Sequence, residues 1–262
     1  IVFLTNAIVA ISISIIFTEN SVNAQKFSDW RENWEIQPGF DISIDAEGFD
    51  LPSSISFIPN PGAGPKDPLY FVAELRGQVK VVTNDRSVLN FAEINYDLQP
   101  ASELPAIAGE VGMAGLCLDS RHGYVFVTLA YRDAKNILRN NIVRFETRPE
   151  IFSVVPDAQI HFTDLFLPYR SVESHQIGSC QVRKNLLYVS VADGRQVQES
   201  QRLGSVLGKV LRMTLDGDPV PTNPFYQDED ISKARNFIWA MGLRNPFGLE
   251  LVGERMFVAD NG

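Results

Sequence analysis

The chain has 262 residues, of which 45% are hydrophobic and 21% are charged. This composition is typical of a soluble globular protein with one sizeable core, and it excludes a disordered chain. A formal net charge of −9 argues against nucleic acid as a partner, because such affinity depends on Lys and Arg neutralising phosphates.

The first 24 residues predict an export signal. An apolar stretch, residues 1–17, is followed by a polar segment that ends in Val22-Asn-Ala24, which suits cleavage before Gln25. The chain starts with neither Met nor a basic segment, so we expect a signal peptide that is truncated at its start. An uncleaved membrane anchor and a core helix are the alternatives. The signal peptide and the membrane anchor both predict a periplasmic or secreted protein. An uncleaved anchor would be its one contact with a membrane.

Residues 25–53 form a lead-in segment, and short strands joined by turns follow over residues 54–262. Enrichment in Val, Ile, Phe and Tyr with alternation predicts these strands, as in Val125-Phe-Val-Thr-Leu-Ala130. The predicted strands are 40–46, 54–58, 69–75, 78–83, 113–118, 124–131, 141–145, 186–191, 206–214, 237–240 and 256–259. No amphipathic helix is predicted after Gln25, so the predicted fold class is all-β.

One strand pattern, an apolar residue with Tyr or Phe and Val, recurs four times. It occurs at Leu69-Tyr-Phe-Val72, Tyr124-Val-Phe-Val127, Leu187-Tyr-Val-Ser190 and Arg255-Met-Phe-Val258. The intervals of about 55 to 70 residues each hold three or four strands, which is the rhythm of propeller blades. Several strands are apolar on both faces, which suits sheets packed face to face. A β-sandwich is the alternative, and it explains the strands but not the recurrence.

The two cysteines, Cys117 and Cys180, lie in strand-like segments. Free cysteines are common core residues and a bridge needs Cα atoms within about 7 Å, so we expect two buried thiols. A disulfide, which export would permit, is the alternative. Their spacing excludes a compact cysteine-based metal site.

A turn near the end of the chain, Gly242-Leu-Arg-Asn-Pro246, separates two apolar strands. Pro246 fixes the bend, and Arg244 and Asn245 then offer a charged fork and an amide to carboxylates or a quinone oxygen at the mouth of a sheet. The alternative is a turn that satisfies only its own backbone.

Five segments in order resemble the glucose/sorbosone dehydrogenase family, whose best-known members are soluble aldose dehydrogenases dependent on pyrroloquinoline quinone. The segments are Val72-Ala-Glu-Leu-Arg-Gly-Gln-Val-Lys-Val-Val82, Gly109-Glu-Val-Gly-Met-Ala-Gly-Leu116, Ser174-His-Gln-Ile-Gly178, Leu207-Gly-Lys-Val-Leu-Arg-Met213 with Asp216-Gly217 and Asn223-Pro-Phe225, and Gly242-Leu-Arg-Asn-Pro-Phe-Gly248. The resemblance implies a six-bladed β-propeller, of which residues 54–262 would be an N-terminal fragment of about three to four blades. The basic cofactor-binding residues of later blades would then lie beyond this sequence.

The resemblance also implies roles for individual residues. His175, in the His-x-x-Gly motif, would be the general base that takes the proton of the sugar's anomeric hydroxyl while hydride passes to the quinone. Gln176 and Glu110 would face the sugar or cofactor, although Glu110 could instead be a solvated loop acid. Arg244 and Asn245 would contact the quinone. His122, in a turn, and His161, on a strand, are expected to have no such role.

Calcium is the second expected cofactor. The family binds it through backbone carbonyls just after a strand, and Gly262 falls at that place; carbonyl oxygens are suitable ligands. Two departures leave the substrate open: Ser174 stands where glucose-oxidising members carry an acid, and Ser179-Cys-Gln-Val182 replaces a Gly-rich strand start.

The sequence therefore predicts an exported quinoprotein that oxidises an aldose to its lactone and passes electrons to an external acceptor. One alternative is a non-catalytic extracellular binding propeller, as in the hedgehog-interacting relatives of this family, because fold does not fix function. The other is a lactone hydrolase that holds one calcium in a cluster of Asp, Glu and Asn.

Overall fold

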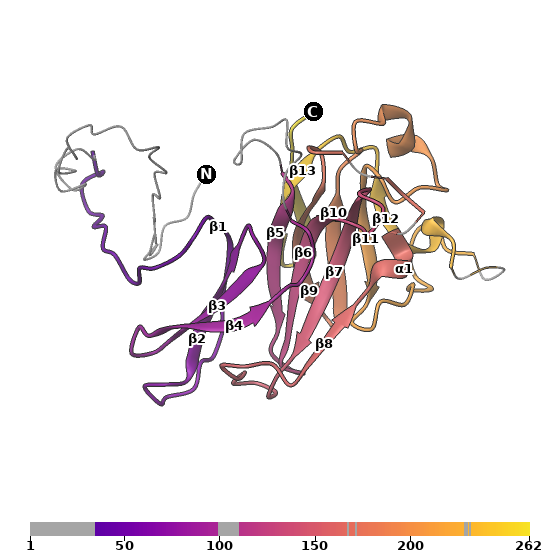
Figure 1. Ribbon diagram of the computed structural model, residues 1–262. Helices are drawn as coiled ribbons and strands as arrows, with labels where there is room; N and C mark the ends of the chain where they lie inside the picture. The colour runs from indigo at the N-terminus through magenta and orange to yellow at the C-terminus, as the bar shows by residue number, and fades with distance from the viewer. Residues whose placement is uncertain (1–34, 99–109, 167, 171, 228–229, 231) are drawn as a thin grey trace.

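The computed structural model describes residues 35–98, 110–166, 168–170, 172–227, 230 and 232–262. These residues form four antiparallel sheets that follow one another in chain order (Figure 1). The first sheet contains β1 (Pro52–Phe57), β2 (Pro68–Glu74), β3 (Gln78–Thr83) and β4 (Val88–Glu93), and the second contains β5 (Gly112–Asp119), β6 (Tyr124–Arg132), β7 (Leu138–Glu146) and β8 (Ala158–His161). The third contains β9 (Ile177–Arg183), β10 (Leu186–Val191), β11 (Lys209–Thr214) and β12 (Ile238–Met241), and the last pairs β13 (Pro246–Val252) with β14 (Arg255–Asp260).

Each sheet is a simple meander in which strands pair in sequence order. The first strands of successive sheets lie against one another, β1 against β5, β5 against β9 and β9 against β13. The recurrent pattern identified in the sequence falls on the second strand of every sheet, β2, β6, β10 and β14. The repeat is thus one sheet long, which is a propeller-like arrangement and excludes a two-sheet sandwich for the described residues.

Strands of the second and third sheets are apolar on both faces because each of these two sheets packs between two others. On β6, Val125, Val127 and Leu129 join the core shared with the first sheet. Phe126 points to the opposite face and joins the core shared with the third sheet. Successive side chains of a strand alternate between faces, so one strand supplies both interfaces.

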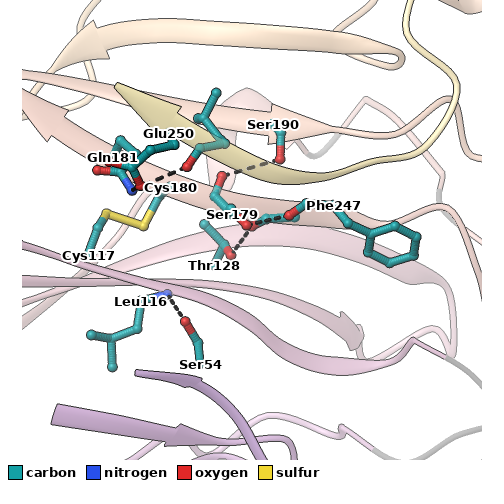
Figure 2. Close-up of a disulfide and its surroundings, with 12 residues drawn as sticks. Ser54, Leu116, Cys117, Thr128, Ser179, Cys180, Gln181, Ser190, Phe247 and Glu250 are labelled. Carbon is teal, nitrogen blue, oxygen red and sulfur yellow. Dashed lines mark hydrogen bonds between the residues drawn. A yellow bond between two sulfur atoms is a disulfide. The ribbon is translucent and has the colours of Figure 1, made fainter. Parts of the chain in front are cut away.

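Side-chain hydrogen bonds cross the interfaces between successive sheets, from the first or second strand of one sheet to the first strand of the other (Figure 2). The backbone N of Leu116 donates to Ser54 Oγ at 3.1 Å, and Thr128 Oγ1 donates to the carbonyl of Gly178 at 2.5 Å. Ser190 Oγ donates to the carbonyl of Pro246 at 2.9 Å. Gly178 is needed at this place, because a Cβ there would lie 2.6 Å from that same carbonyl oxygen.

A disulfide also joins the second and third sheets. Cys117 on β5 and Cys180 on β9 are bonded, with their Cα atoms 5.7 Å apart (Figure 2). The expectation of two buried thiols is therefore wrong. Both residues are buried as expected, but the close approach of two first strands brings the sulfurs together.

The predicted strand at 40–46 is also wrong, since these residues lie outside every sheet. Ala46 and Phe49 instead pack on Tyr70, Val72 and Val82 of the first sheet. The predicted ranges also miss four strands: β4 and β8, the outermost strands of two sheets, which have half-exposed and mixed patterns, and β9 and β13, the first strands of the last two sheets.

Helical structure in the described ranges is short. It consists of the single-turn helix α1 (Thr163–Phe166) and two 3₁₀ segments, Val197–Gln201 and Ala234–Phe237. None of the helices in these ranges is long and apolar enough to cross a membrane. The predicted signal peptide, residues 1–24, lies outside the described residues.

Candidate active site

The predicted site residues gather where the first strands of three sheets begin. Glu110 precedes β5 by two residues, His175 precedes β9 by two residues, and Asn245 immediately precedes β13. Because these strands lie side by side, the segments that lead into them meet at one end of the sheets. The backbone N of Glu110 accordingly donates to the carbonyl of Glu173 at 2.7 Å, and that of Asp193 donates to the carbonyl of Arg244 at 2.8 Å.

His175 is paired with Asp193. The Nδ1 atom of His175 lies 2.7 Å from Oδ1 of Asp193, and the two residues are 7% and 1% exposed. The strand register brings them together: Ile177 at the start of β9 pairs with Val191 at the end of β10, so a register extended by two residues places Asp193 opposite His175. Backbone hydrogen bonds continue over this step, from the N of Gly194 to the carbonyl of His175.

The loop geometry at His175 is also fixed from the second sheet. His175 has a φ of 61°, in the left-handed region that non-glycine residues seldom adopt. Its backbone N donates to Oε2 of Glu110 at 2.5 Å. Glu110, which is half-buried, therefore holds the histidine backbone, and its contact with the sugar or cofactor stays a prediction.

This pair can act as a proton acceptor. A carboxylate at Nδ1 requires that nitrogen to carry the proton, which leaves the lone pair on Nε2. A proton taken at Nε2 would make an imidazolium, and the Asp193 carboxylate would stabilise its charge. The arrangement is that of a general base with an orienting acid.

Three of the other predicted residues line one small cavity beside His175. Glu110, Gln176 and Asn245 contribute to its wall, together with Ile177, Gly178 and Phe247. Gln176 and Asn245 are 3% and 4% exposed, so their amide groups lie in the interior and not in bulk water. A carboxylate and two amides facing one space can bind hydroxyl groups of a polar ligand.

Arg244 lies at the surface next to this cavity and does not line it. Its backbone N and that of Asn245 donate to the two carboxylate oxygens of Asp260 at 3.1 and 2.7 Å, which fixes the turn. Its Nη1 atom donates to the carbonyl of Asn261 at 2.5 Å. The guanidinium is therefore exposed and bound to a neutral carbonyl, which leaves its charge available to an anionic ligand.

Gly262 ends the chain beside Asp260 and is exposed. No group of three or more His, Cys, Asp or Glu side chains in the described ranges could hold a metal ion. Backbone carbonyls were the expected calcium ligands, so a calcium site at Gly262 stays a prediction.

The other two histidines lie away from this site. His122 is in the turn at the far end of β5, with Nδ1 2.5 Å from Oδ2 of Asp119. His161 ends β8, contacts the hydroxyl of Tyr96 and Nε2 of Gln159, and has a pKa lowered by burial.

Asp193 is the site residue that the sequence reasoning missed. Its only local signal is its position in an Asp-Gly pair two residues after the buried strand β10, Leu186–Val191. Acidic residues before glycine usually belong to turns, so that signal does not separate it from other turn residues.

The fold and the site define the class of protein: an all-β protein of propeller-like sheets, with a buried histidine and carboxylate at the end of the sheets where the first strands begin. Residues 49–262 match the family described as Glucose / Sorbosone dehydrogenase. The chain therefore belongs to the glucose/sorbosone dehydrogenase family.

Individual relatives agree with this membership. Aldose sugar dehydrogenase YliI of Escherichia coli K12 is 34% identical over 68 residues, which is 26% of this chain and 18% of YliI. A solved structure from Thermus thermophilus, assigned as an oxidoreductase (glucose dehydrogenase), is 26% identical with a TM-score of 0.62 over 83% of this chain and 60% of its own. The fold is also similar to that of the aldose sugar dehydrogenase of Streptomyces coelicolor in its form bound to pyrroloquinoline quinone (PQQ). The identity is 21% and the TM-score 0.54, over 81% of this chain and 62% of that relative. The chain thus spans about 60% of its solved relatives.

Proposed function

We propose that the protein to which this chain belongs is an exported quinoprotein sugar dehydrogenase that oxidises an aldose to its lactone. The buried pair of His175 and Asp193 carries the proposal, because it supplies an oriented base at the site end of the sheets. Family membership and the similarity to glucose and aldose sugar dehydrogenases support the reaction class.

Each site residue has a stated task in this proposal. Nε2 of His175 takes the proton of the anomeric hydroxyl, and Asp193 stabilises the resulting imidazolium. Glu110 holds the histidine backbone, and Gln176 binds sugar hydroxyls beside it. The exposed guanidinium of Arg244 and the amide of Asn245 fit a quinone that carries carboxylates.

Pyrroloquinoline quinone, when bound, accepts the hydride from the sugar, and an external acceptor would reoxidise it. We further propose a calcium ion with the carbonyl of Gly262 among its ligands, since carbonyl oxygens suit that ion. The S. coelicolor relative, which was solved with PQQ bound, supports the quinone in this fold.

The proposed architecture is a six-bladed propeller. The three four-stranded sheets and the hairpin of β13 and β14 would be its first blades, and the 60% coverage of the solved T. thermophilus relative is consistent with further blades. Residues 1–24 would direct export, and the disulfide fits an oxidising compartment outside the cytoplasm.

The test uses the full-length gene product. Purified apoprotein is mixed with calcium and pyrroloquinoline quinone, and dye reduction is followed with a panel of aldoses. We expect sugar-dependent reduction that is lost in His175→Ala. His122→Ala is the matched control, because it removes another histidine paired with a carboxylate, at the far end of β5, and should reduce dye as the wild type does.

The outcomes separate the candidate functions. Reduction that persists in His175→Ala would exclude the histidine as the base. Absence of quinone binding, measured by fluorescence titration, would exclude the quinoprotein and favour the extracellular binding module.

A further inference from the structure

An arginine, Arg195, lies next to the histidine pair and is fixed by one hydrogen bond to Asp193 and another to Ser174. The backbone N of Arg195 donates to Oδ1 of Asp193 at 2.8 Å, the same oxygen that contacts His175. Its side chain turns back across the loop, and Nε donates to Oγ of Ser174 at 2.6 Å. Ser174 directly precedes His175, so the guanidinium is held against the residue next to the proposed base in the chain.

The charge of Arg195 is not neutralised within the described ranges of the chain. No carboxylate there lies within ion-pair distance of its guanidinium, and Ser174 offers it only a neutral hydroxyl. The acids nearby have other partners: Asp193 and Glu110 bind His175, and Glu173 pairs with Arg132 at 3.1 Å.

The side chain is also well placed to bind an anion. Arg195 is exposed, so a ligand can reach it, yet the bond from Nε to Ser174 limits its rotation. Nε is occupied, which leaves the two terminal nitrogens to form parallel hydrogen bonds. Such a fork matches the two oxygens of a carboxylate.

We propose that Arg195 determines substrate specificity, and that the preferred substrates are uronic acids, aldoses with a carboxylate at the end of the chain remote from the anomeric carbon. This inference rests on the proposed dehydrogenase function. The reaction at the anomeric carbon is the same as for a neutral sugar: hydride goes to the quinone, the hydroxyl proton goes to His175, and the product is a lactone. The remote carboxylate is bound by Arg195 and takes no part in the redox step.

The experiment compares acidic and neutral sugars with the full-length protein loaded with calcium and pyrroloquinoline quinone. The ratio of kcat/KM for D-glucuronate to kcat/KM for D-glucose is measured, and D-galacturonate is compared with D-galactose in the same way. We expect ratios above one that fall with added salt. In Arg195→Gln the ratios should fall by about 10- to 100-fold, the usual effect of losing a hydrogen bond to a charged group.

Two substitutions of Ser174 form a matched pair. Ser174→Asp places a carboxylate against the guanidinium, so the preference for uronates should be lost or reversed. Ser174→Ala removes the hydroxyl that accepts from Nε and adds no charge, so it should retain more of the preference than Ser174→Asp. An equal effect of the two substitutions would overturn the charge argument.

Parallel binding measurements separate this inference from the proposed function. A carboxylate of the quinone could bind the same fork, so quinone affinity is titrated in Arg195→Gln; a large loss there, with unchanged sugar ratios, would assign Arg195 to the cofactor. If no sugar is oxidised, the proposed function fails, and the carboxylate subsite is then tested by calorimetry with glucuronate. Tighter binding of glucuronate to the wild type than to Arg195→Gln would support the subsite, and equal binding would overturn it. Oxidation of neutral sugars without a preference for uronates would refute the inference and leave the dehydrogenase intact.

Discussion

Removal of the disulfide should destabilise the protein strongly. The test is the double substitution of Cys117→Ala and Cys180→Ala, which removes the disulfide that cross-links the second and third sheets. This link joins β5 and β9, the strands whose first residues follow Glu110 and His175. The substitution therefore loosens both the sheet interface and the frame of the site.

The magnitude follows from the length of chain that the bridge closes. The two cysteines are 63 residues apart in sequence. The loop-closure entropy for that separation corresponds to about 4 kcal/mol of stability at 25 °C, since the cross-link restricts the unfolded chain. The expected loss of unfolding free energy is thus a large part of the total stability of a typical domain.

Urea denaturation of the full-length protein measures this loss, with peptide mapping by mass spectrometry to detect the Cys117–Cys180 link. Reduced wild-type protein is the control, because it keeps both sulfurs and lacks only the bond. A loss of unfolding free energy below about 1 kcal/mol, in both the double variant and the reduced wild type, would contradict the entropic estimate. Two free thiols in the folded wild type would restore the sequence-based expectation and refute the bridge.

Three further predictions concern the pair of His175 and Asp193, a sheet interface and a buried amine. In Asp193→Asn the amide can donate to Nδ1 of His175 and stabilise the tautomer that carries its proton on Nε2, which cannot accept a proton there. We expect kcat to fall by about 10²- to 10⁴-fold with quinone affinity retained. An unchanged kcat would exclude the orienting role of Asp193. Gly178→Ala puts a Cβ 2.6 Å from the carbonyl oxygen of Pro246 and should lower the unfolding free energy by about 1–3 kcal/mol. Gly204→Ala is the control, because no atom lies within 4 Å of a Cβ at that position. Equal losses of unfolding free energy in the two variants would contradict the steric argument. Lys209 is fully buried, with Nζ bound to the carbonyls of Glu199, Ser200 and Leu207, and burial lowers its pKa from 10.5 to about 8. The unfolded chain therefore binds more protons between pH 8 and 10.5, so the unfolding free energy of the wild type should rise with pH across that window relative to Lys209→Met; a constant difference would show that the amine does not titrate there.

Much of the sheet structure was predictable because it depends on local pattern. The predicted strand at 78–83 coincides with β3, and those at 124–131 and 186–191 match β6 and β10 closely. β6 and β10 are buried on both faces and rich in Val, Leu and Tyr, whereas β3 is rich in Val with half-buried Gln78 and Lys80 on one face. The strand predicted at 40–46 has a similar pattern but no neighbouring strand, and hydrogen-bond pairing, not pattern, makes a strand.

The candidate site was predictable only in part. Resemblance indicated Glu110, His175, Gln176, Arg244 and Asn245, and the structure brings Glu110, Gln176 and Asn245 to one cavity next to His175. Asp193 and Arg195 carried no signal of this kind. Their importance depends on contacts with residues 18 and 21 positions away in the chain.

The sequence by itself determined the all-β class, the four-fold recurrence and the family motifs, because alternation and turn residues act over a few neighbouring positions. Only the tertiary structure decided the bridge between Cys117 and Cys180 and the pairing of His175 with Asp193. Both depend on distances between strands, which are set by register and by the packing of one sheet against the next. A shift of one residue in that register would send each of these side chains to the opposite face.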